Sequence, residues 1–352
     1  MKVLHIINDL DEDGGAQRIV RDLCSEMAGT QAMVLTLHAL PERSRRELDS
    51  IGVQHASIGS PGLQNLHAAI AMIRSADILH VHLFPCLYLA ALLQKKKLFT
   101  EHNTWNRRRR RTWFRPFDRF VYRRYDRIVC ISDATRHALE LWVGEGPPEK
   151  SVIENGVRLD RFSPTVRRAP SYPTTILMIA RFTPQKDQMT LIRAMAKLPS
   201  STRLLLVGDG PLRREAEETV RETGLQDRVE FRGRVPSEGV PQLLADVDLC
   251  VQSSRWEGFG LVAVEAMACG VPVVAARVPG LSEVVGDPAL LFDGGDTDAL
   301  VQTVETLLAN PDIYAASSRA AIERSRLYDA KRMASGYLGV YEALVGLHDR
   351  SK

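Results

Sequence analysis

Short apolar runs alternate with amphipathic segments along most of the chain, and this alternation limits the possible folds more than any other feature. In the first half, apolar runs predict strands at residues 3–7, 32–37, 78–83, 98–101 and 127–131. Apolar residues at helical spacing predict helices at 19–27, 66–73, 87–93 and 134–142. Unbroken apolar strands that alternate with helices are typical of a parallel sheet covered on both faces.

The same alternation restarts after a proline-rich segment at 163–173, which reads as a linker between domains. Strands are predicted at 175–179, 204–207, 229–232, 249–251, 271–275 and 290–292. The expected domains are 1–165 and 166–328, and a last helix within 329–352 is expected to cross back to the first domain. The predicted fold is α/β, with two Rossmann-like, doubly wound parallel sheets facing a central cleft, where such sheets bind ligands.

Composition narrows the class of protein. Hydrophobic residues make up 45% of the chain and charged residues 25%, as in globular proteins, and the net charge is only +3. The five cysteines show neither CxxC pairs nor zinc-ligand spacing, which predicts reduced thiols. The first residues read as a strand rather than a signal peptide, and no apolar run is long enough to span a bilayer. We therefore expect a cytoplasmic protein whose membrane contact, if any, is peripheral.

The stretch RWEGFGLVAVEAMACGVPVV, residues 255–274, is the strongest chemical signal. Gly258 and Gly260 directly precede an apolar helical run, so free backbone amides at a helix start are predicted there, where phosphate is favoured. Glu257 lies before this helix and Glu265 within it. Carboxylates accept hydrogen bonds from sugar or ribose hydroxyls, so the arrangement suits a sugar nucleotide.

A second motif, IARFTPQKD at residues 179–187, follows a predicted strand. The guanidinium of Arg181 and the ammonium of Lys186 can together neutralise a diphosphate. Away from this context, two such cations would be ordinary surface residues.

In their combination, these motifs resemble the retaining GT-B glycosyltransferases of family GT4. The resemblance covers nearly the whole chain and implies transfer of a sugar from a UDP- or GDP-sugar to a hydroxyl of a lipid-linked or polysaccharide precursor. It assigns catalysis to His102, Glu257, Arg181 and Lys186. It assigns donor binding to Gly15, Ala16, Arg181, Lys186, Gly208, Arg234, Val235, Glu257, Gly258, Phe259, Gly260, Leu261 and Glu265.

Some of these assignments also have plainer interpretations. The loop of Gly15 and Ala16 could be a simple turn, and His102 is assigned only because of its place in the family pattern. The chain departs from the family pattern at Ala180, Arg158 and Pro279, and the last leaves recognition of the donor sugar open. Two other functions remain alternatives: a UDP-sugar 2-epimerase of the same architecture, and a catalytically inactive partner that binds a nucleotide sugar.

No metal or other cofactor is expected. His80 and His82 alternate on one strand without a carboxylate at suitable spacing, so they read as core histidines. Neither of the two motifs, residues 179–187 and 255–274, contains a DxD loop, which holds a metal on the diphosphate in other glycosyltransferases. The nucleotide sugar would be a substrate.

An arginine run, Arg107, Arg108, Arg109, Arg110 and Arg111, precedes an aromatic-rich helical segment. A basic face beside an aromatic one suits an anionic membrane surface or the diphosphate of a lipid-linked acceptor. The plainer alternative is that the aromatic residues are core and the arginines are solvated. Nucleic acid is not an expected partner, because the rest of the chain is nearly neutral and carries no RNA-binding motif.

Overall fold

The computed structural model describes residues 1–10, 14–27, 29–60 and 63–346, and it forms two compact units. The first unit comprises Met1–Gly156 and the chain from Ala330 onward, and the second comprises Val157–Asp329. The boundary thus lies before the expected one at 165/166. The proline-rich segment belongs to the second unit, because the backbone N–H of Arg167 donates to Ser318 (2.8 Å) and the Ser171 hydroxyl donates to Asp248 (2.6 Å).

The first unit contains a seven-stranded sheet in which every pair of neighbours is parallel, with the order β3-β2-β1-β4-β5-β6-β7. Its strands are β1 (Lys2–Ile7), β2 (Gln31–Thr36), β3 (Gln54–Ser57), β4 (Ile78–His82), β5 (Lys96–Glu101), β6 (Arg127–Cys130) and β7 (Glu149–Val152). The central strands are buried on both faces because helices cover both, as their apolar sequences predict.

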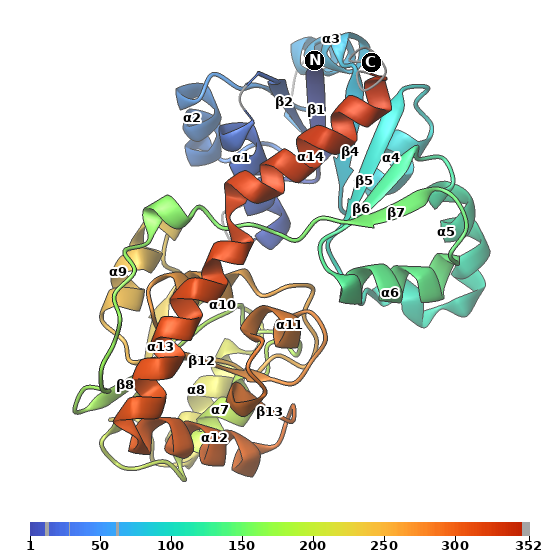
Figure 1. The fold of residues 1–352 in the computed structure, drawn as a ribbon. Coiled ribbons are helices and arrows are strands. Elements are labelled where there is room, and N and C mark those ends of the chain that lie inside the picture. The colour runs from blue at the N-terminus through green and yellow to red at the C-terminus, as the bar shows by residue number, and fades with distance from the viewer. Residues whose placement is uncertain (11–13, 28, 61–62, 347–352) are drawn as a thin grey trace. The chain divides into compact units, whose positions relative to one another are not determined.

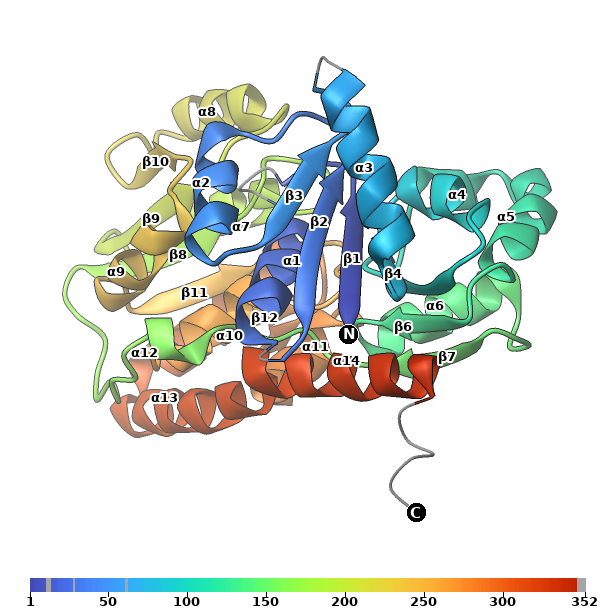
Figure 2. The ribbon, with the colours of Figure 1, turned by 90° about the horizontal axis from the view of Figure 1, so that it is seen from above.

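Two groups of helices cover this sheet. The helices of the first unit are α1 (Gly15–Glu26), α2 (Glu42–Ser50), α3 (Leu63–Ser75), α4 (Cys86–Ala91), α5 (Arg115–Tyr122), α6 (Asp133–Val143) and α14 (Ala330–Val345). Buried residues of α1 and α2 share one apolar cluster, and those of α3 to α6 share another. The helix α14 is in contact with α1, and Figure 1 shows its ribbon crossing that of α1. Figure 2 shows α3 beside β1, which it contacts.

The second unit contains a six-stranded parallel sheet with the order β10-β9-β8-β11-β12-β13. Its strands are β8 (Thr174–Ile179), β9 (Thr202–Val207), β10 (Val229–Gly233), β11 (Leu249–Gln252), β12 (Val273–Ala276) and β13 (Leu291–Phe292). Its helices are α7 (Gln188–Met195), α8 (Arg213–Glu222), α9 (Val240–Ala245), α10 (Leu261–Ala268), α11 (Leu281–Val285), α12 (Thr297–Ala309) and α13 (Pro311–Ser325).

Strand order reverses once in each sheet, between β1 and β4 and between β8 and β11. Beyond the carboxyl ends of the strands at such a reversal, the connecting loops diverge and leave room for a ligand. All five cysteines are free thiols. Among the described residues, no helix is both long and apolar enough to cross a membrane.

Candidate functional site

In the second unit, the loops after β8 and β11 meet at the strand-order reversal. Lys186 of the first loop forms an ion pair with Glu257 of the second, and both side chains are mostly buried, at 19% and 13% exposure. The Glu257 carboxylate also accepts from the Ser254 hydroxyl (3.3 Å) and from the backbone N–H of Gly258 (3.2 Å). A cation and a carboxylate are thereby fixed side by side where a ligand of this sheet would bind.

Further contacts lock these two loops together. The Arg255 guanidinium pairs with the buried carboxylate of Asp187 at 3.1 Å. The Gln185 side chain donates to the backbone carbonyl of Trp256 (3.0 Å), and the Ser253 hydroxyl donates to that of Asp187 (2.9 Å). Each contact links one loop to the other, so the two loops that carry Lys186 and Glu257 are held together.

The loop after β9 approaches the same edge through glycine. Gly208 has φ of +130°, and a Cβ there would lie 2.1 Å from the carbonyl oxygen of Ala180. Only glycine fits so close to another backbone. The backbone of Gly208 therefore lies directly against the loop that contains Arg181. The Arg181 side chain is exposed, and it forms no ion pair with another described residue.

The helix α10 begins at Leu261, and its N-cap residue Gly260 has φ of +107°. Glu265 is almost completely buried in this helix, whereas Leu261 at its start is half-buried. The Phe259 side chain packs edge-on against Tyr328, with ring centroids 5.2 Å apart, so it is a core residue. Only the backbone of Phe259 remains for a ligand. Gly258 lies in the loop directly before α10, close to the first backbone amides of the helix.

The chain leaves β10 at Gly233, and the next two residues are Arg234, which is exposed, and Val235, which is half-buried. Because β10 is an edge strand next to β9, these residues follow a strand end on the same side of the sheet as Gly208. The structure thus brings the candidate donor residues of the second unit to one edge of one sheet.

In the first unit, the candidate residues also follow the carboxyl ends of central strands. Gly15 and Ala16 open α1, which follows β1, and His102 directly follows β5. Gly15 is exposed, whereas Ala16 and His102 are buried, with 8% and 9% exposure. The strands β1, β4 and β5 are neighbours, so the loops that follow them share one edge.

A histidine cluster lies beneath this edge, and one of its members carried no signal in the sequence. Nitrogen atoms of His5, His80 and His82 lie within 4.8 Å of one another. Burial lowers the pKa of His5 to about 4 and that of His102 to about 3, so these rings are neutral near pH 7. Recognition of His5 would have required the register between β1 and β4, which pairs His5 with His80.

The five arginines of the run have different environments. Arg108 pairs with Asp118 (2.9 Å), and Arg109 pairs with Glu101 (3.0 Å). Arg110 lies over the Trp105 ring, 5.0 Å from its centroid, and both Arg110 and Arg111 are exposed. The Arg107 side chain lies outside the described part. The charges of Arg108 and Arg109 are therefore paired within the first unit, whereas Arg110 and Arg111 present exposed side chains.

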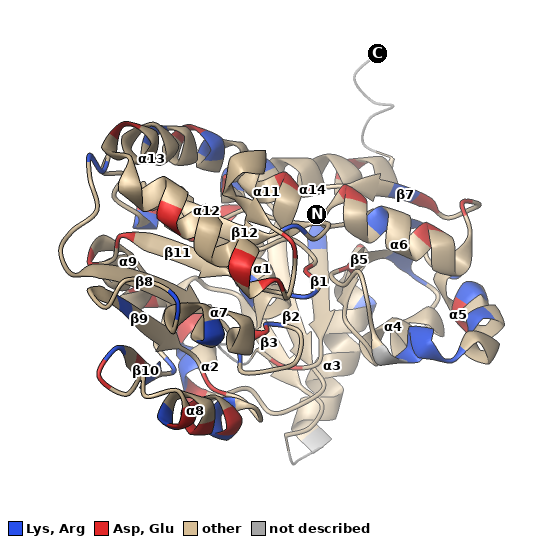
Figure 3. Ribbon diagram, turned by 90° about the horizontal axis from the view of Figure 1, so that it is seen from below, with Lys and Arg blue, Asp and Glu red and all other residues tan. Residues whose placement is uncertain are grey.

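The large apolar and aromatic side chains on and around α5 are divided between core and surface. Val121, Tyr122 and Tyr125 are buried in the sheet-covering cluster. Trp113, Phe117 and Phe120 are 69%, 50% and 61% exposed. We call these three residues with Arg110 and Arg111 the aromatic–arginine surface, and Figure 3 shows basic residues around α4 and α5. Part of the aromatic segment is therefore core, and part of it is exposed at the surface.

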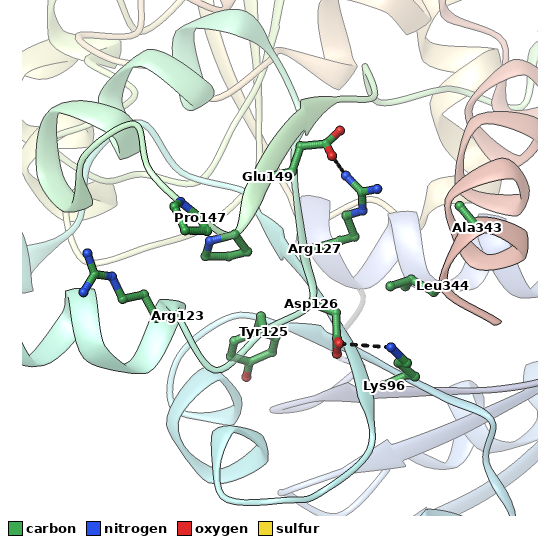
Figure 4. A pocket seen from close by; sticks show the side chains of 10 residues that line it. Lys96, Arg123, Tyr125, Asp126, Arg127, Pro147, Glu149, Ala343 and Leu344 are labelled. Carbon is green, nitrogen blue, oxygen red and sulfur yellow. Dashed lines mark hydrogen bonds and ion pairs between the residues drawn. The ribbon is translucent and has the colours of Figure 1, made fainter. Parts of the chain in front are cut away.

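A cavity of about 700 Å³ in the first unit lies elsewhere. Lys96 and Arg127, the first residues of β5 and β6, line it, so it opens at the amino ends of these strands. Figure 4 shows Lys96 turned toward Asp126 and Arg127 toward Glu149, and each forms an ion pair. The cavity lies at the edge of the sheet opposite His102, so we do not assign it to the candidate site.

Comparison with known proteins agrees with this arrangement. Residues 13–161 match the model described as Glycosyltransferase Family 4, and residues 162–325 match the model of group 1 glycosyl transferases. The chain is 24% identical to a GDP-mannose:cellobiosyl-diphosphopolyprenol alpha-mannosyltransferase of Xanthomonas campestris, over 98% of each protein. It is 30% identical to a component of the phosphatidylinositol N-acetylglucosaminyltransferase of Arabidopsis thaliana, over 52% of this chain but only 42% of that protein.

A solved structure of Anabaena Alr3699/HepE in complex with UDP and glucose is similar over 97% of this chain and 100% of its own, with a TM-score of 0.83 and 22% identity. Together with the two parallel sheets, this likeness shows the GT-B fold.

Proposed function

The chain belongs to glycosyltransferase family 4, and from this premise we propose that it transfers a sugar from a UDP- or GDP-sugar to a hydroxyl of a lipid-linked or polysaccharide precursor, with retention of anomeric configuration. The second unit binds the nucleotide sugar, and the first unit binds the acceptor. UDP and glucose in the Anabaena structure support a nucleotide-sugar donor.

One observation carries this proposal: the ion pair between Lys186 and Glu257 at the strand-order reversal of the second sheet. A diphosphate that enters beside Lys186 competes with Glu257 for the ammonium. The carboxylate oxygens of Glu257 can then accept hydrogen bonds from hydroxyls of the donor sugar. The same pair thereby serves both halves of a nucleotide-sugar donor.

The transfer step breaks the bond between the sugar and the diphosphate, so negative charge grows on the leaving group. Arg181, Lys186 and the backbone amides at the start of α10 stabilise this charge. Glu265 binds the ribose, and Arg234 and Val235 lie against the base. The acceptor oxygen attacks on the face that the diphosphate leaves, and the departing phosphate takes its proton. Retention follows from this front-face attack.

A lipid-linked acceptor is supported by the relatives and by the surface of the first unit. The Xanthomonas protein is named for a diphosphopolyprenol acceptor, and the Arabidopsis protein for phosphatidylinositol. The aromatic–arginine surface exposes Trp113 and Phe120 beside cations. Aromatic rings and arginines together suit the interface of an anionic membrane. We propose that this surface holds the enzyme on the membrane that carries its acceptor.

The test is incubation with radiolabelled UDP- and GDP-sugars, with and without a lipid extract. Release of nucleotide that depends on the extract, together with label in the lipid phase, supports the transferase. Product formed without any acceptor would indicate the epimerase, and binding without turnover would indicate the inactive nucleotide-sugar binder. The Glu257→Gln variant should lose the transfer, whereas Glu218→Gln, which alters an exposed ion pair with Arg214 on α8, should retain it.

A further inference from the structure

Three histidines of the first unit form a hydrogen-bonded row that ends at His102. His5 Nδ1 lies 3.2 Å from His82 Nε2, and His82 Nδ1 lies 3.1 Å from His102 Nε2. The rings of His5 and His82 are fully buried. His80 stands outside this row, because Tyr341 and Thr100 occupy its two nitrogens at 2.6 and 2.7 Å. We call His5, His82 and His102 the imidazole row.

Proton counting allows only two arrangements of this row. A neutral imidazole has one N–H and one bare nitrogen, so His82 donates through one nitrogen and accepts through the other. If His82 donates to His102, it accepts from His5, and His102 carries its proton on Nδ1. If His82 donates to His5, it accepts from His102, and His102 carries its proton on Nε2. The tautomers of all three rings are therefore coupled.

Neutrality of the row follows from its surroundings. Burial lowers the pKa of His82 well below its usual value, and neighbouring histidines lower it further. In the described part of the chain, the row is bordered by His80, whose pKa is also lowered well below its usual value, and no carboxylate bonds to the row. The two-state proton count therefore holds near pH 7.

The far end of the row selects between the two arrangements. Nε2 of His5 is buried and has no hydrogen-bond partner among the described residues. The second arrangement would place an N–H on that atom, and buried N–H groups without an acceptor are rarer than acceptors without a donor. The first arrangement leaves only a bare nitrogen there. It is therefore favoured.

We propose that His82 and His5 are positioning residues that hold the proton of His102 on Nδ1, so that His102 meets the bound substrate as a hydrogen-bond donor. Nε2 of His102 is occupied by His82, and no described residue bonds to its Nδ1. A donor at this position can bond a hydroxyl or phosphate oxygen of the substrate. The role toward substrate rests on the proposed function, whereas the tautomer does not.

The experiment measures the tautomer directly. Protein labelled with ¹⁵N-histidine is examined by long-range ¹H–¹⁵N spectroscopy near pH 7 without substrate, and a His102→Gln variant identifies the signals of His102. The expected result is a protonated Nδ1 and a bare Nε2. A protonated Nε2 in the wild-type protein would overturn the proposal. So would one equivalent of tightly bound zinc, because a metal would take the place of the hydrogen bonds.

Two substitutions of His82 separate positioning from packing. The amide of His82→Asn can still donate to His102 from the place of Nδ1, whereas His82→Leu fills the space without a donor. His102 should keep its tautomer in His82→Asn and show a mixture in His82→Leu, at similar melting temperatures. Transfer should fall about tenfold in His82→Leu, equivalent to one lost hydrogen bond, and should recover in His82→Asn.

The tautomer of His102 and its role toward substrate can be contradicted separately. If the spectra agree but the protein transfers no sugar, only the proposed function is wrong. If both variants keep the wild-type spectrum, the row does not control His102.

Discussion

Nη2 of Arg109 lies 3.0 Å from Oε2 of Glu101, and both side chains are buried, with 8% and 4% exposure. The same carboxylate accepts from the Tyr122 hydroxyl at 2.6 Å. Glu101 is the last residue of β5, directly before His102. An arginine from a run of five therefore supports the strand end that presents a candidate catalytic residue.

Replacement of Arg109 should destabilise the protein more than replacement of Arg111. Arg109→Met leaves the buried carboxylate of Glu101 without its cation, which costs about 3–5 kcal/mol of unfolding free energy. Arg111→Met changes an exposed side chain and should stay within about 0.5 kcal/mol of wild type. Urea denaturation of the two variants measures both. Equal effects would contradict the structural role of Arg109.

Lys186→Ala should lower kcat/KM without a comparable loss of stability. Loss of one preorganised charge contact costs about 2–4 kcal/mol of transition-state stabilisation, or roughly 30- to 1000-fold. The matched control is Lys197→Ala, which removes an exposed pair with Asp298 and should leave the rate unchanged. A wild-type rate in Lys186→Ala would remove Lys186 from the diphosphate site.

Catalysis should continue in excess EDTA. Arg181 and Lys186 supply positive charge for the leaving diphosphate, so a divalent ion is not needed for that purpose. The rate is measured with the protein treated with chelator beforehand. Complete loss of transfer that only Mg²⁺ or Mn²⁺ restores would contradict this expectation.

The first unit should lose stability as the pH falls below 6.5. The pKa of His5 is lowered from 6.5 to about 4 by burial, so the unfolded chain binds a proton first. Unfolding then takes up protons between these values, and stability rises with pH in this window. His5 alone contributes about 3 kcal/mol, which is fully present above pH 6.5 and lost as the pH falls through about 4.

Urea denaturation at several pH values checks this prediction. His5→Phe should flatten the dependence, whereas His67→Gln, an exposed substitution, should not. Parallel curves for wild type and His5→Phe would show that His5 titrates alike in both states.

Liposome flotation tests the aromatic–arginine surface. The wild-type protein should float with anionic vesicles and not with neutral ones. Changing Arg110 and Arg111 to Ser should weaken binding about 30-fold, since each cation near the surface adds about 1 kcal/mol. Arg213 and Arg214 on α8, changed to Ser together, give the same charge change elsewhere and should not matter. No flotation, or equal flotation of all three proteins, would exclude this surface as a membrane contact.

The sequence predicted the central strands well because they are buried on both faces and therefore continuously apolar. It did not reveal the edge strands β3 and β7, whose sequences are QHAS and EKSV. An edge strand is covered less completely, so its residues need not be apolar. The proline-rich segment was predicted to be a linker between domains. Hydrogen bonds to Ser318 and Asp248, which are distant in sequence, instead fix it to the second unit.

The candidate site was predictable where a local motif defines it and not where contacts between strands do. Lys186 and Glu257 each stand in a recognisable loop, and their pairing follows from the parallel sheet. The five arginines look alike in sequence, and only Glu101 and Asp118 distinguish two of them. The part played by His5 depends on strand register, which no local pattern reports.

The path of the chain has a practical consequence for engineered hybrids. The second unit is an insertion between Gly156 and Ala330, and α14 returns Tyr341 to His80 and Tyr337 to Thr100. A chimera that exchanges the whole C-terminal half would give the first unit a foreign α14 and break these buried contacts. The donor-binding half should instead be exchanged as a cassette with two junctions, one at 156/157 and one at 329/330. Grafts with these borders should fold where simple end-to-end fusions fail.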